Sequence, residues 1–341
     1  MNKSESQENL APVAITMGCP VGIGPEIICK LFSRKDIPCA GRAIIVGDGG
    51  VLRQAAELLQ MRIDIVSWLP GEPIVKGTIP VFQVGSVRSS LMSWGQPDLV
   101  TGRVMGQYII DAVSLIGARH CSALVTCPIS KKSLQQAGYS YPGHTEMLAA
   151  LTDTRQVRMM MAGPSLKVVL VTIHEPLRRV CELLTRQEIG NCIEMTRIAL
   201  QQDFAIANPR IAVAGLNPHS GEDSLFGDEE ARIIAPAVAE NSVQGDVSGP
   251  WPPDTVFYKA AAGQFDAVIA MYHDQGLIPF KLLHFHDGVN VTLGLPLVRT
   301  SVDHGTAYDI AGRNLADPTS LLAALTMAQT IAANRARQGI A

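Results

Sequence analysis

Three histidines of this chain follow strand-like apolar segments, each at the point where the segment ends. His174 and His219 terminate runs of small and β-branched apolar residues, and His273 comes just after the apolar segment 266–270. Polar groups at the end of a buried strand face a cleft in α/β enzymes. Imidazole is a common ligand of divalent metals, and three protein ligands with one open position are typical of a catalytic site. We therefore predict a metal site of His174, His219 and His273. The alternative is three unrelated histidines at strand ends.

Cationic and amide side chains follow the last of these histidines. Lys281, Asn290 and Arg299 are spaced through the segment downstream of His273. Beside a metal site they would suit a phosphate or a carboxylate, because a guanidinium binds either group with two hydrogen bonds. The alternative is that they are solvated surface charges.

A second candidate for anion binding is the segment Pro142-Gly-His-Thr-Glu146, which predicts the start of a helix at a glycine turn. Free backbone N–H groups there, together with the side chains of His144 and Thr145, would hold an anionic or hydroxylated ligand. The same pattern fits Thr145 as the N-cap of the helix.

The composition predicts a globular α/β protein. The chain has 341 residues, of which 47% are apolar and 17% charged, and this length suggests two domains. The net charge of −3 gives no electrostatic signature for nucleic acid or an anionic membrane. No apolar run reaches the roughly 18 residues that span a bilayer. Seven cysteines without C-x-x-C spacing are interpreted as reduced thiols, and the polar residues 1–10 as a loose tail, so we expect a cytoplasmic protein.

Strand-like and helical segments alternate along the chain, which predicts an α/β fold with a largely parallel sheet. The strand-like segments include 13–17, 42–46 and 122–126, and the helical segments include 25–32, 51–59, 108–116, 145–151 and 319–333. The segment 245–253 is rich in glycine and proline and is interpreted as a loop. Residues 16–26 form a glycine-rich turn whose spacing differs from the dinucleotide-binding fingerprint.

Six motifs, in order, resemble those of the 4-hydroxythreonine-4-phosphate dehydrogenase family. They are Gly24-Pro-Glu26, Pro142-Gly-His-Thr-Glu146, Leu216-Asn-Pro-His219, Met271-Tyr-His-Asp-Gln-Gly276, Gly294-Leu-Pro-Leu-Val-Arg-Thr-Ser301 and Asp303-His-Gly-Thr306. The resemblance implies a two-domain fold like that of isocitrate and isopropylmalate dehydrogenases, with the active-site cleft between the domains. Residues 1–126 with 296–341 would form the first domain, on the cofactor side. Residues 127–295 would form the second, with the metal ligands and the dimer contacts.

The resemblance also assigns residues to the site. The three histidines match the divalent-metal ligands (Zn, Mg, Mn or Co), and the third of them, His273, would come from the partner subunit of a homodimer. The positions that match the substrate-binding residues are His144, Thr145, Lys281, Asn290 and Arg299. The Asp303–Gly312 loop resembles an adenosine-binding loop, which places His304, Gly305, Thr306 and Asp309 at NAD. A carboxylate at Asp309 would favour NAD over NADP, although Arg313 would tolerate a 2′-phosphate.

The function implied is a metal-dependent, NAD-linked oxidation of 4-phosphooxy-L-threonine in vitamin B6 biosynthesis. The β-keto acid formed would decarboxylate to 3-amino-2-oxopropyl phosphate, with Asp274 or Lys281 as the base for the hydroxyl proton. The alternative within the family is a D-threonate or D-erythronate 4-phosphate dehydrogenase of sugar-acid catabolism, which forms dihydroxyacetone phosphate.

Two other classes of function are a metal-dependent hydrolase and a non-catalytic metabolite-binding protein. The nucleotide-like loop argues against a hydrolase. Cys19 stands where the family usually has an acidic residue, and it is the one feature that favours a non-catalytic protein.

Overall fold

The computed structural model describes residues 10–34, 38–87, 93–243 and 245–340, which form two compact units. Unit 1 comprises residues 1–156 and 295–333, and unit 2 comprises residues 157–294 and 334–341. The sequence-based boundary was placed at residue 126, so the segment 127–156 lies in unit 1 and not in the second domain. Apart from Leu10, the predicted N-terminal tail lies outside the described residues.

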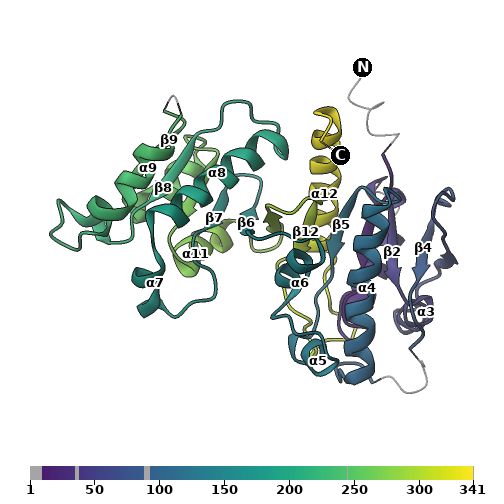
Figure 1. Cartoon of the computed structure of the whole chain (residues 1–341). Coiled ribbons are helices and arrows are strands. Elements are labelled where there is room, and N and C mark those ends of the chain that lie inside the picture. Colours follow the sequence, from purple (N-terminus) through teal and green to yellow (C-terminus); the bar gives the residue numbers. More distant parts are fainter. Residues whose placement is uncertain (1–9, 35–37, 88–92, 244, 341) are drawn as a thin grey trace. The chain divides into compact units, whose positions relative to one another are not determined.

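Unit 1 contains a sheet in which every described pair of neighbouring strands is parallel (Figure 1). In spatial order its strands are β3 (Asp64–Ser67), β4 (Thr78–Gln83), β2 (Ala43–Gly47), β1 (Val13–Thr16), β5 (Ala123–Thr126) and β12 (Arg299–Val302). The burial pattern of β1, β2 and β5 is continuous, as expected for parallel strands that are covered on both faces.

The helices of unit 1 alternate with these strands, as the sequence predicted. They are α2 (Gly24–Ser33), α3 (Gly49–Leu58), α4 (Leu99–Gly117), α5 (Lys131–Gln136), α6 (His144–Leu151) and α12 (Thr319–Arg337), with a 3-10 turn at Pro38–Arg42. Helix α4 is long and apolar enough to cross a membrane by length and composition alone. It contacts β1, β2 and β5 through buried residues such as Met105 and Tyr108, which identifies it as a core helix (Figure 1).

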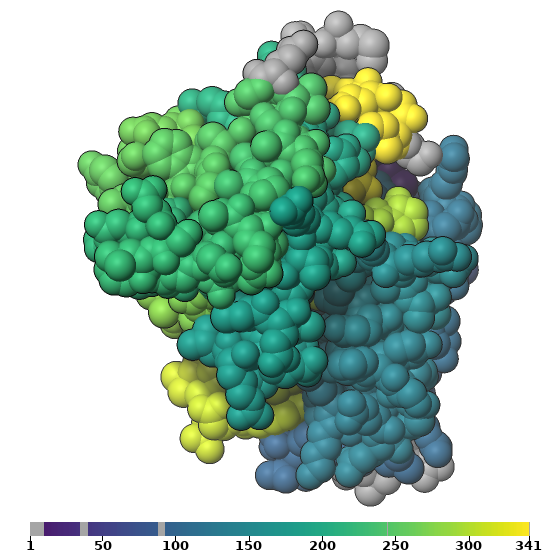
Figure 2. Space-filling model, turned by 60° about the vertical axis from the view of Figure 1, so that its left-hand side comes forward, coloured from purple at the N-terminus to yellow at the C-terminus, as the bar shows by residue number. Residues whose placement is uncertain are grey.

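Unit 2 contains parallel and antiparallel strands and forms the teal to yellow-green part of the surface in Figure 2. In spatial order they are β11 (Val289–Leu293), β6 (Arg158–Ala162), β7 (Lys167–Leu170), β10 (Ala267–Ala270), β8 (Ile211–Ala214) and β9 (Val247–Trp251). The β11–β6 and β6–β7 pairs are antiparallel, whereas β7–β10, β10–β8 and β8–β9 are parallel. The three strands that precede the candidate histidines are therefore parallel neighbours.

Helices cover both faces of the β7–β10–β8 strands. They are α7 (Leu177–Leu183), α8 (Arg186–Gln202), α9 (Ala235–Asn241), α10 (Pro253–Ala261) and α11 (His273–His284), with short turns at Pro218–Gly221 and Glu230–Ile234. Alternate strand residues such as Val168 and Val268 pack against Val256 of α10 and Phe280 of α11 in one buried cluster. Helix α8 contacts β7 and β10 as well, so helices enclose these strands; β10 is buried throughout and β7 is buried from Val168 onward.

The interpretation of segment 245–253 as a loop was wrong, because residues 247–251 form strand β9. The strand lies at the end of the strand order and pairs with β8 alone, through an irregular register around Ala212 and Ala214. An edge strand tolerates a proline, which lacks the N–H needed for pairing on a second side. Gly249 and Pro250 made the segment resemble a loop, but a strand with these residues is possible at the edge of a sheet.

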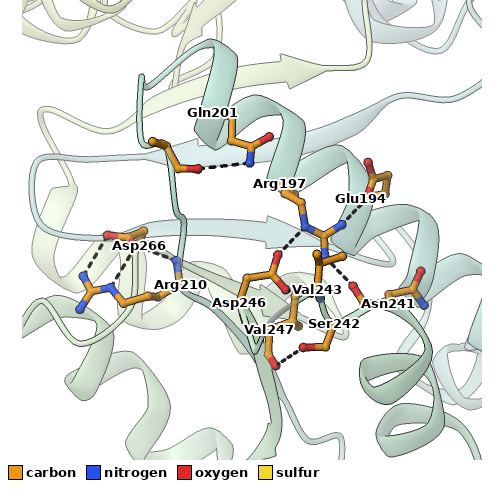
Figure 3. A network of polar contacts seen from close by, with 11 residues as sticks. Glu194, Arg197, Gln201, Arg210, Asn241, Ser242, Val243, Asp246, Val247 and Asp266 are labelled. Carbon is orange, nitrogen blue, oxygen red and sulfur yellow. Dashed lines mark hydrogen bonds and ion pairs between the residues drawn. The ribbon is translucent and has the colours of Figure 1, made fainter.

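Ion pairs hold the amino ends of the parallel strands in unit 2 (Figure 3). Arg210, just before β8, donates to the Asp266 carboxylate just before β10, with Nη2 at 3.0 Å from Oδ1. Arg197 of α8 binds the carboxylates of Glu194 and Asp246 and the main-chain oxygen of Asn241, at the end of α9. The side chains of Arg197 and Asp246 are 10% and 15% exposed. This network lies at the edge of the strands opposite to the histidines.

We expect Arg197→Met to lower the free energy of unfolding by about 3 kcal/mol, because it leaves the largely buried Asp246 carboxylate without its cation. The control is Arg232→Met, which removes an ion pair whose side chains are 58% and 62% exposed. This change should cost less than about 1 kcal/mol. Urea unfolding measures both values, and equal losses for the two variants would contradict the assigned role of Arg197.

Candidate active site

His174 and His273 lie together at the carboxyl ends of β7 and β10. Their ring centroids are 5.7 Å apart. Helix α11 begins at His273 and lies close to β7, because a Cβ on Gly276 would stand 2.6 Å from Cγ1 of Val168. The missing side chain at Gly276 thus permits the close packing that brings His273 beside His174. His174 itself lies in the loop after β7, which ends earlier than the sequence pattern suggested.

Asp274 orients the ring of His273. Its Oδ1 lies 2.7 Å from Nδ1 of His273, and the carboxylate is otherwise largely exposed. When Nδ1 donates to this carboxylate, Nε2 is the nitrogen that carries the lone pair for a metal, a common arrangement of metal-binding histidines. A cavity of about 280 Å³ adjoins the two rings. It is lined by Ile173, His174, Glu175, Leu177, Val180, Tyr272, His273 and Asp274.

His219 is not grouped with the other two histidines of the same chain. Its ring packs near that of Phe226, with centroids 6.3 Å apart. Within the described ranges, no group of three histidine, cysteine or carboxylate side chains is placed to hold a metal ion. One chain therefore brings together His174 and His273, two of the three predicted ligands.

The substrate residues predicted in unit 1 form a partly buried, electropositive site. Helix α6 begins at His144 after Gly143, and no side chain caps its first N–H groups. The alternative of Thr145 as the N-cap was therefore wrong, because Gly143 takes that position. Nε2 of His144 is buried without a hydrogen-bond partner. Burial, and then the charges of Arg299 and Lys131, hold the pKa of His144 well below its usual value.

Arg299 supplies the buried positive charge of this site. It is 4% exposed and donates from Nη2 to Oγ1 of Thr126 at 2.9 Å. Burial lowers its pKa to about 10, although the Glu146 carboxylate raises it. An anionic ligand would offset this cost of burial and would also meet the N–H groups at the start of α6. The alternative of solvated surface charge is wrong for Arg299.

Lys131 belongs to this electropositive site but was missed from the sequence. It begins α5, shortly after the exit from β5, and its Cε would lie 3.5 Å from a Cβ on Gly143. The histidines were identified as polar residues that follow a buried strand. Lys131 follows β5 in the same way, so the same pattern could have identified it.

Two further predicted residues lie in unit 2. Lys281 is half-buried on α11, two helical turns after Asp274 and on the same face. Asn290 is half-buried on β11, where it pairs with Met161 of β6.

The predicted cofactor loop packs against the glycine-rich turn of unit 1. The main-chain N–H of Ile23 donates to the oxygen of Thr306 at 3.2 Å. Gly305 and Asp309 are exposed, and a Cβ on Gly305 would meet only open space. Nε2 of His304 is buried without a hydrogen-bond partner. These features leave the loop open to a ligand.

Cys19 is part of the same packing. Its thiol lies 3.3 Å from the hydroxyl of Tyr308, which donates to it. Burial raises the pKa values of both groups, so the thiol stays protonated. The residue that departs from the family pattern therefore serves as a neutral support of the loop. Cys19, Cys29, Cys121, Cys127, Cys181 and Cys192 are free thiols, as the sequence predicted.

A family model described as pyridoxal phosphate biosynthetic protein PdxA matches residues 40–328. A 4-hydroxythreonine-4-phosphate dehydrogenase of Desulfosudis oleivorans is 52% identical over 320 residues, which cover 93% of this chain and 94% of that protein. A D-threonate 4-phosphate dehydrogenase of Pectobacterium atrosepticum is 41% identical and covers 94% of this chain and 99% of its own.

The same relationship holds for the fold. The crystal structure of 4-hydroxythreonine-4-phosphate dehydrogenase from Klebsiella pneumoniae superposes with a TM-score of 0.89 and 40% identity. The match covers 95% of this chain and 98% of that chain. The predicted α/β fold is thus confirmed by the chain's own strands and helices and by this likeness.

We expect the free energy of unfolding to fall as the pH drops below 6.5, partly because of His144. The folded protein keeps His144 neutral, whereas the unfolded chain takes up a proton near its ordinary pKa of 6.5. Between pH 6.5 and 5.5 this single group should cost about 1 kcal/mol. Urea unfolding of His144→Asn should show a smaller fall over this range. The exposed His120→Asn serves as the control, and an unchanged pH dependence in His144→Asn would contradict the buried neutral imidazole.

Proposed function

Because this chain belongs to the family of the pyridoxal phosphate biosynthetic protein PdxA, we propose that it is a cytoplasmic, NAD-linked dehydrogenase of 4-phosphooxy-L-threonine. Membership makes the chain an oxidoreductase rather than a hydrolase or a non-catalytic binding protein. The carbinol carbon of the substrate would give its hydride to NAD. The resulting β-keto acid would lose CO₂ to yield 3-amino-2-oxopropyl phosphate. The observation that carries the proposal is the His174–His273 pair beside a cavity.

The proposed metal ligands are His174, His219 and His273. The donor set fits a divalent ion, because Asp274 directs the Nε2 lone pair of His273 outward and neutral imidazoles suit Zn, Co and Mn. A hydroxy-acid ligand would equally suit Mg. When bound, the ion would act as a Lewis acid that stabilises negative charge on the substrate oxygen.

The substrate's anionic groups are assigned to His144, Thr145, Lys281, Asn290 and Arg299. In unit 1, the buried guanidinium of Arg299 and the uncapped start of α6 support this assignment. His144 is neutral, so its unpartnered Nε2 can accept or donate a hydrogen bond according to its tautomer. The two candidates for the hydroxyl proton are Lys281 and Asp274, whose carboxylate also accepts from His273.

NAD is assigned to His304, Gly305, Thr306 and Asp309. The exposed carboxylate of Asp309 would accept hydrogen bonds from ribose hydroxyls and repel a 2′-phosphate. The unpartnered Nε2 of His304 offers a further group for the nucleotide.

The amino substrate is preferred over a hydroxy analogue. The Desulfosudis relative, which is named for the amino substrate, is 52% identical, whereas the Pectobacterium relative, named for D-threonate 4-phosphate, is 41% identical. The second candidate is therefore a D-threonate or D-erythronate 4-phosphate dehydrogenase.

We further propose a homodimer whose subunits share the metal site. Helix α11 and its C-cap residue Phe285 expose an apolar stripe, in which Ile278, Leu282 and Phe285 are 69%, 85% and 70% exposed. Helical periodicity places this stripe on the face that carries Asp274 and Lys281. A second copy seated on it would come next to the site, where the described chain brings together two of the three proposed ligands, His174 and His273.

The substrate is tested by NADH formation with added divalent metal. We expect the highest kcat/KM with 4-phosphooxy-L-threonine, lower values with D-threonate and D-erythronate 4-phosphates, and little turnover of the unphosphorylated acids. Arg299→Ala should lower kcat/KM by about ten- to a hundredfold, because a charge-assisted hydrogen bond is lost. Equal turnover with and without the phosphate would contradict the assigned anion site. A higher kcat/KM with the threonate or erythronate ester would select the second candidate.

Pairwise mixing of inactive histidine variants tests the shared site. If one ligand comes from the partner, two of the three pairs among His174→Ala, His219→Ala and His273→Ala should regain activity. Equimolar mixing should restore about a quarter of the wild-type activity, because half of the dimers are mixed and each has one intact site. The histidine common to both active pairs is the one from the partner.

The dimer contact supplies the control for this experiment. Adding Leu282→Glu to both chains should abolish the regain, since a carboxylate on the apolar stripe opposes association, and the protein should elute as a monomer. Leu69→Glu, at a 57% exposed position of unit 1, should leave the regain intact. A failure of all three pairs to regain activity would contradict a site shared between subunits.

A further inference from the structure

The loop that carries His219 is fastened to a buried carboxylate. Glu230 is 5% exposed, and its Oε1 accepts from the main-chain N–H groups of Leu216 and Asn217, both at 2.7 Å. Its Oε2 accepts from Nδ2 of Asn217 at 2.9 Å. The same oxygen would lie 2.8 Å from a Cβ on Gly221. The carboxylate therefore contacts the loop on both sides of His219.

The backbone of this loop needs such a support. His219, Ser220, Glu222, Asp223 and Ser224 all have positive φ, from 42° to 72°, as does Gly221. L-residues are strained in this region, and such strain persists only where the surroundings determine the conformation. The groups that donate to Glu230, on Leu216 and Asn217, directly precede this run. These hydrogen bonds therefore fix the position of the main chain just before His219.

Gln275 joins this loop to the exit of β10. It is 8% exposed, and its Oε1 accepts from the main-chain N–H of Met271 at 2.6 Å. Its Nε2 donates to the main-chain oxygen of Gly215 at 2.7 Å. The two bonds link the segment before His273 to the segment before His219. A single side chain thereby sets the spacing between two strand exits.

We propose that Glu230 and Gln275 are positioning residues of the metal site, where they fix His219 and His273 in each chain without contacting the metal. This inference rests on the metal ligands proposed above. Glu230 is bonded to neutral N–H groups of the loop, unlike the carboxylates in the Arg197 network, which face cations. A buried carboxylate is costly to desolvate, so its use to hold one loop indicates that the conformation of that loop matters.

Two nearly isosteric substitutions test the proposal. Glu230→Gln retains an acceptor for the main-chain N–H groups but places an NH₂ group against Nδ2 of Asn217. Gln275→Glu retains the bond from Met271 and turns a carboxylate oxygen toward the oxygen of Gly215. Zn²⁺ binding is measured by equilibrium dialysis on folded protein, and the visible spectrum of the Co²⁺ form reports the ligand geometry. We expect metal affinity to fall about ten- to a hundredfold, as for other residues that orient metal ligands, and the Co²⁺ spectrum to change.

A purely structural role would give a different result. In that case both variants would melt at lower temperature in EDTA but bind Zn²⁺ with wild-type affinity, and the proposal would be overturned. Glu240→Gln and Gln264→Glu, both at exposed positions of unit 2, are the matched controls. If one variant does not fold, the other still decides, because each breaks a different contact.

His219→Ala separates this proposal from the proposed function. If His219→Ala abolishes Zn²⁺ binding while Glu230→Gln and Gln275→Glu bind normally, the metal site stands and the positioning role fails. If His219→Ala binds Zn²⁺ as the wild type does, the metal site itself is wrong and the positioning role falls with it.

Discussion

Parallel pairing of β7, β10 and β8 determines which side chains of unit 2 can meet. In parallel strands the amino ends share one edge and the carboxyl ends the other, so the residues after the three strands emerge together. The amino edge is closed by ion pairs such as Arg210–Asp266. The carboxyl edge carries histidines, and a cavity adjoins two of them. Stabilising ion pairs and the proposed metal ligands thus lie at opposite ends of the same strands, and a change of register would affect both.

A buried cation is the corresponding constraint in unit 1. Arg299 starts β12, a fully buried strand, and burial depresses the pKa of its guanidinium. Burial and the charge of Arg299 lower the pKa of the neighbouring His144, so this imidazole is neutral and adds no second charge. A site of this kind favours an anionic ligand. The negative charge of the ligand stabilises the buried guanidinium in place of the water that burial removes. The carboxylate and phosphate proposed for the substrate are groups of this kind.

The sequence identified the histidines because a buried strand has a continuous apolar pattern and its polar exit stands out. The same pattern failed for β9, where Gly249 and Pro250 are compatible with a strand only at the edge of a sheet. Glu230 and Gln275 could not be found in this way, since their burial depends on tertiary contacts with residues far away in the chain. The family resemblance is confirmed by the matches along the chain. It could not reveal the hydrogen bond from Tyr308 to Cys19, because that contact joins segments far apart in the chain.

The strained loop and the apolar stripe of α11 have a common thermodynamic consequence under the proposed shared site. If a metal takes ligands from two chains, metal binding and dimerisation stabilise each other by the same free energy, because linkage is reciprocal. The positive φ values of residues 219–224 make the presentation of His219 costly in a chain alone. Metal binding would offset part of this strain energy only in the dimer, where the proposed site is complete. The exposed Leu282 and the strained His219 would then be two parts of one coupled equilibrium.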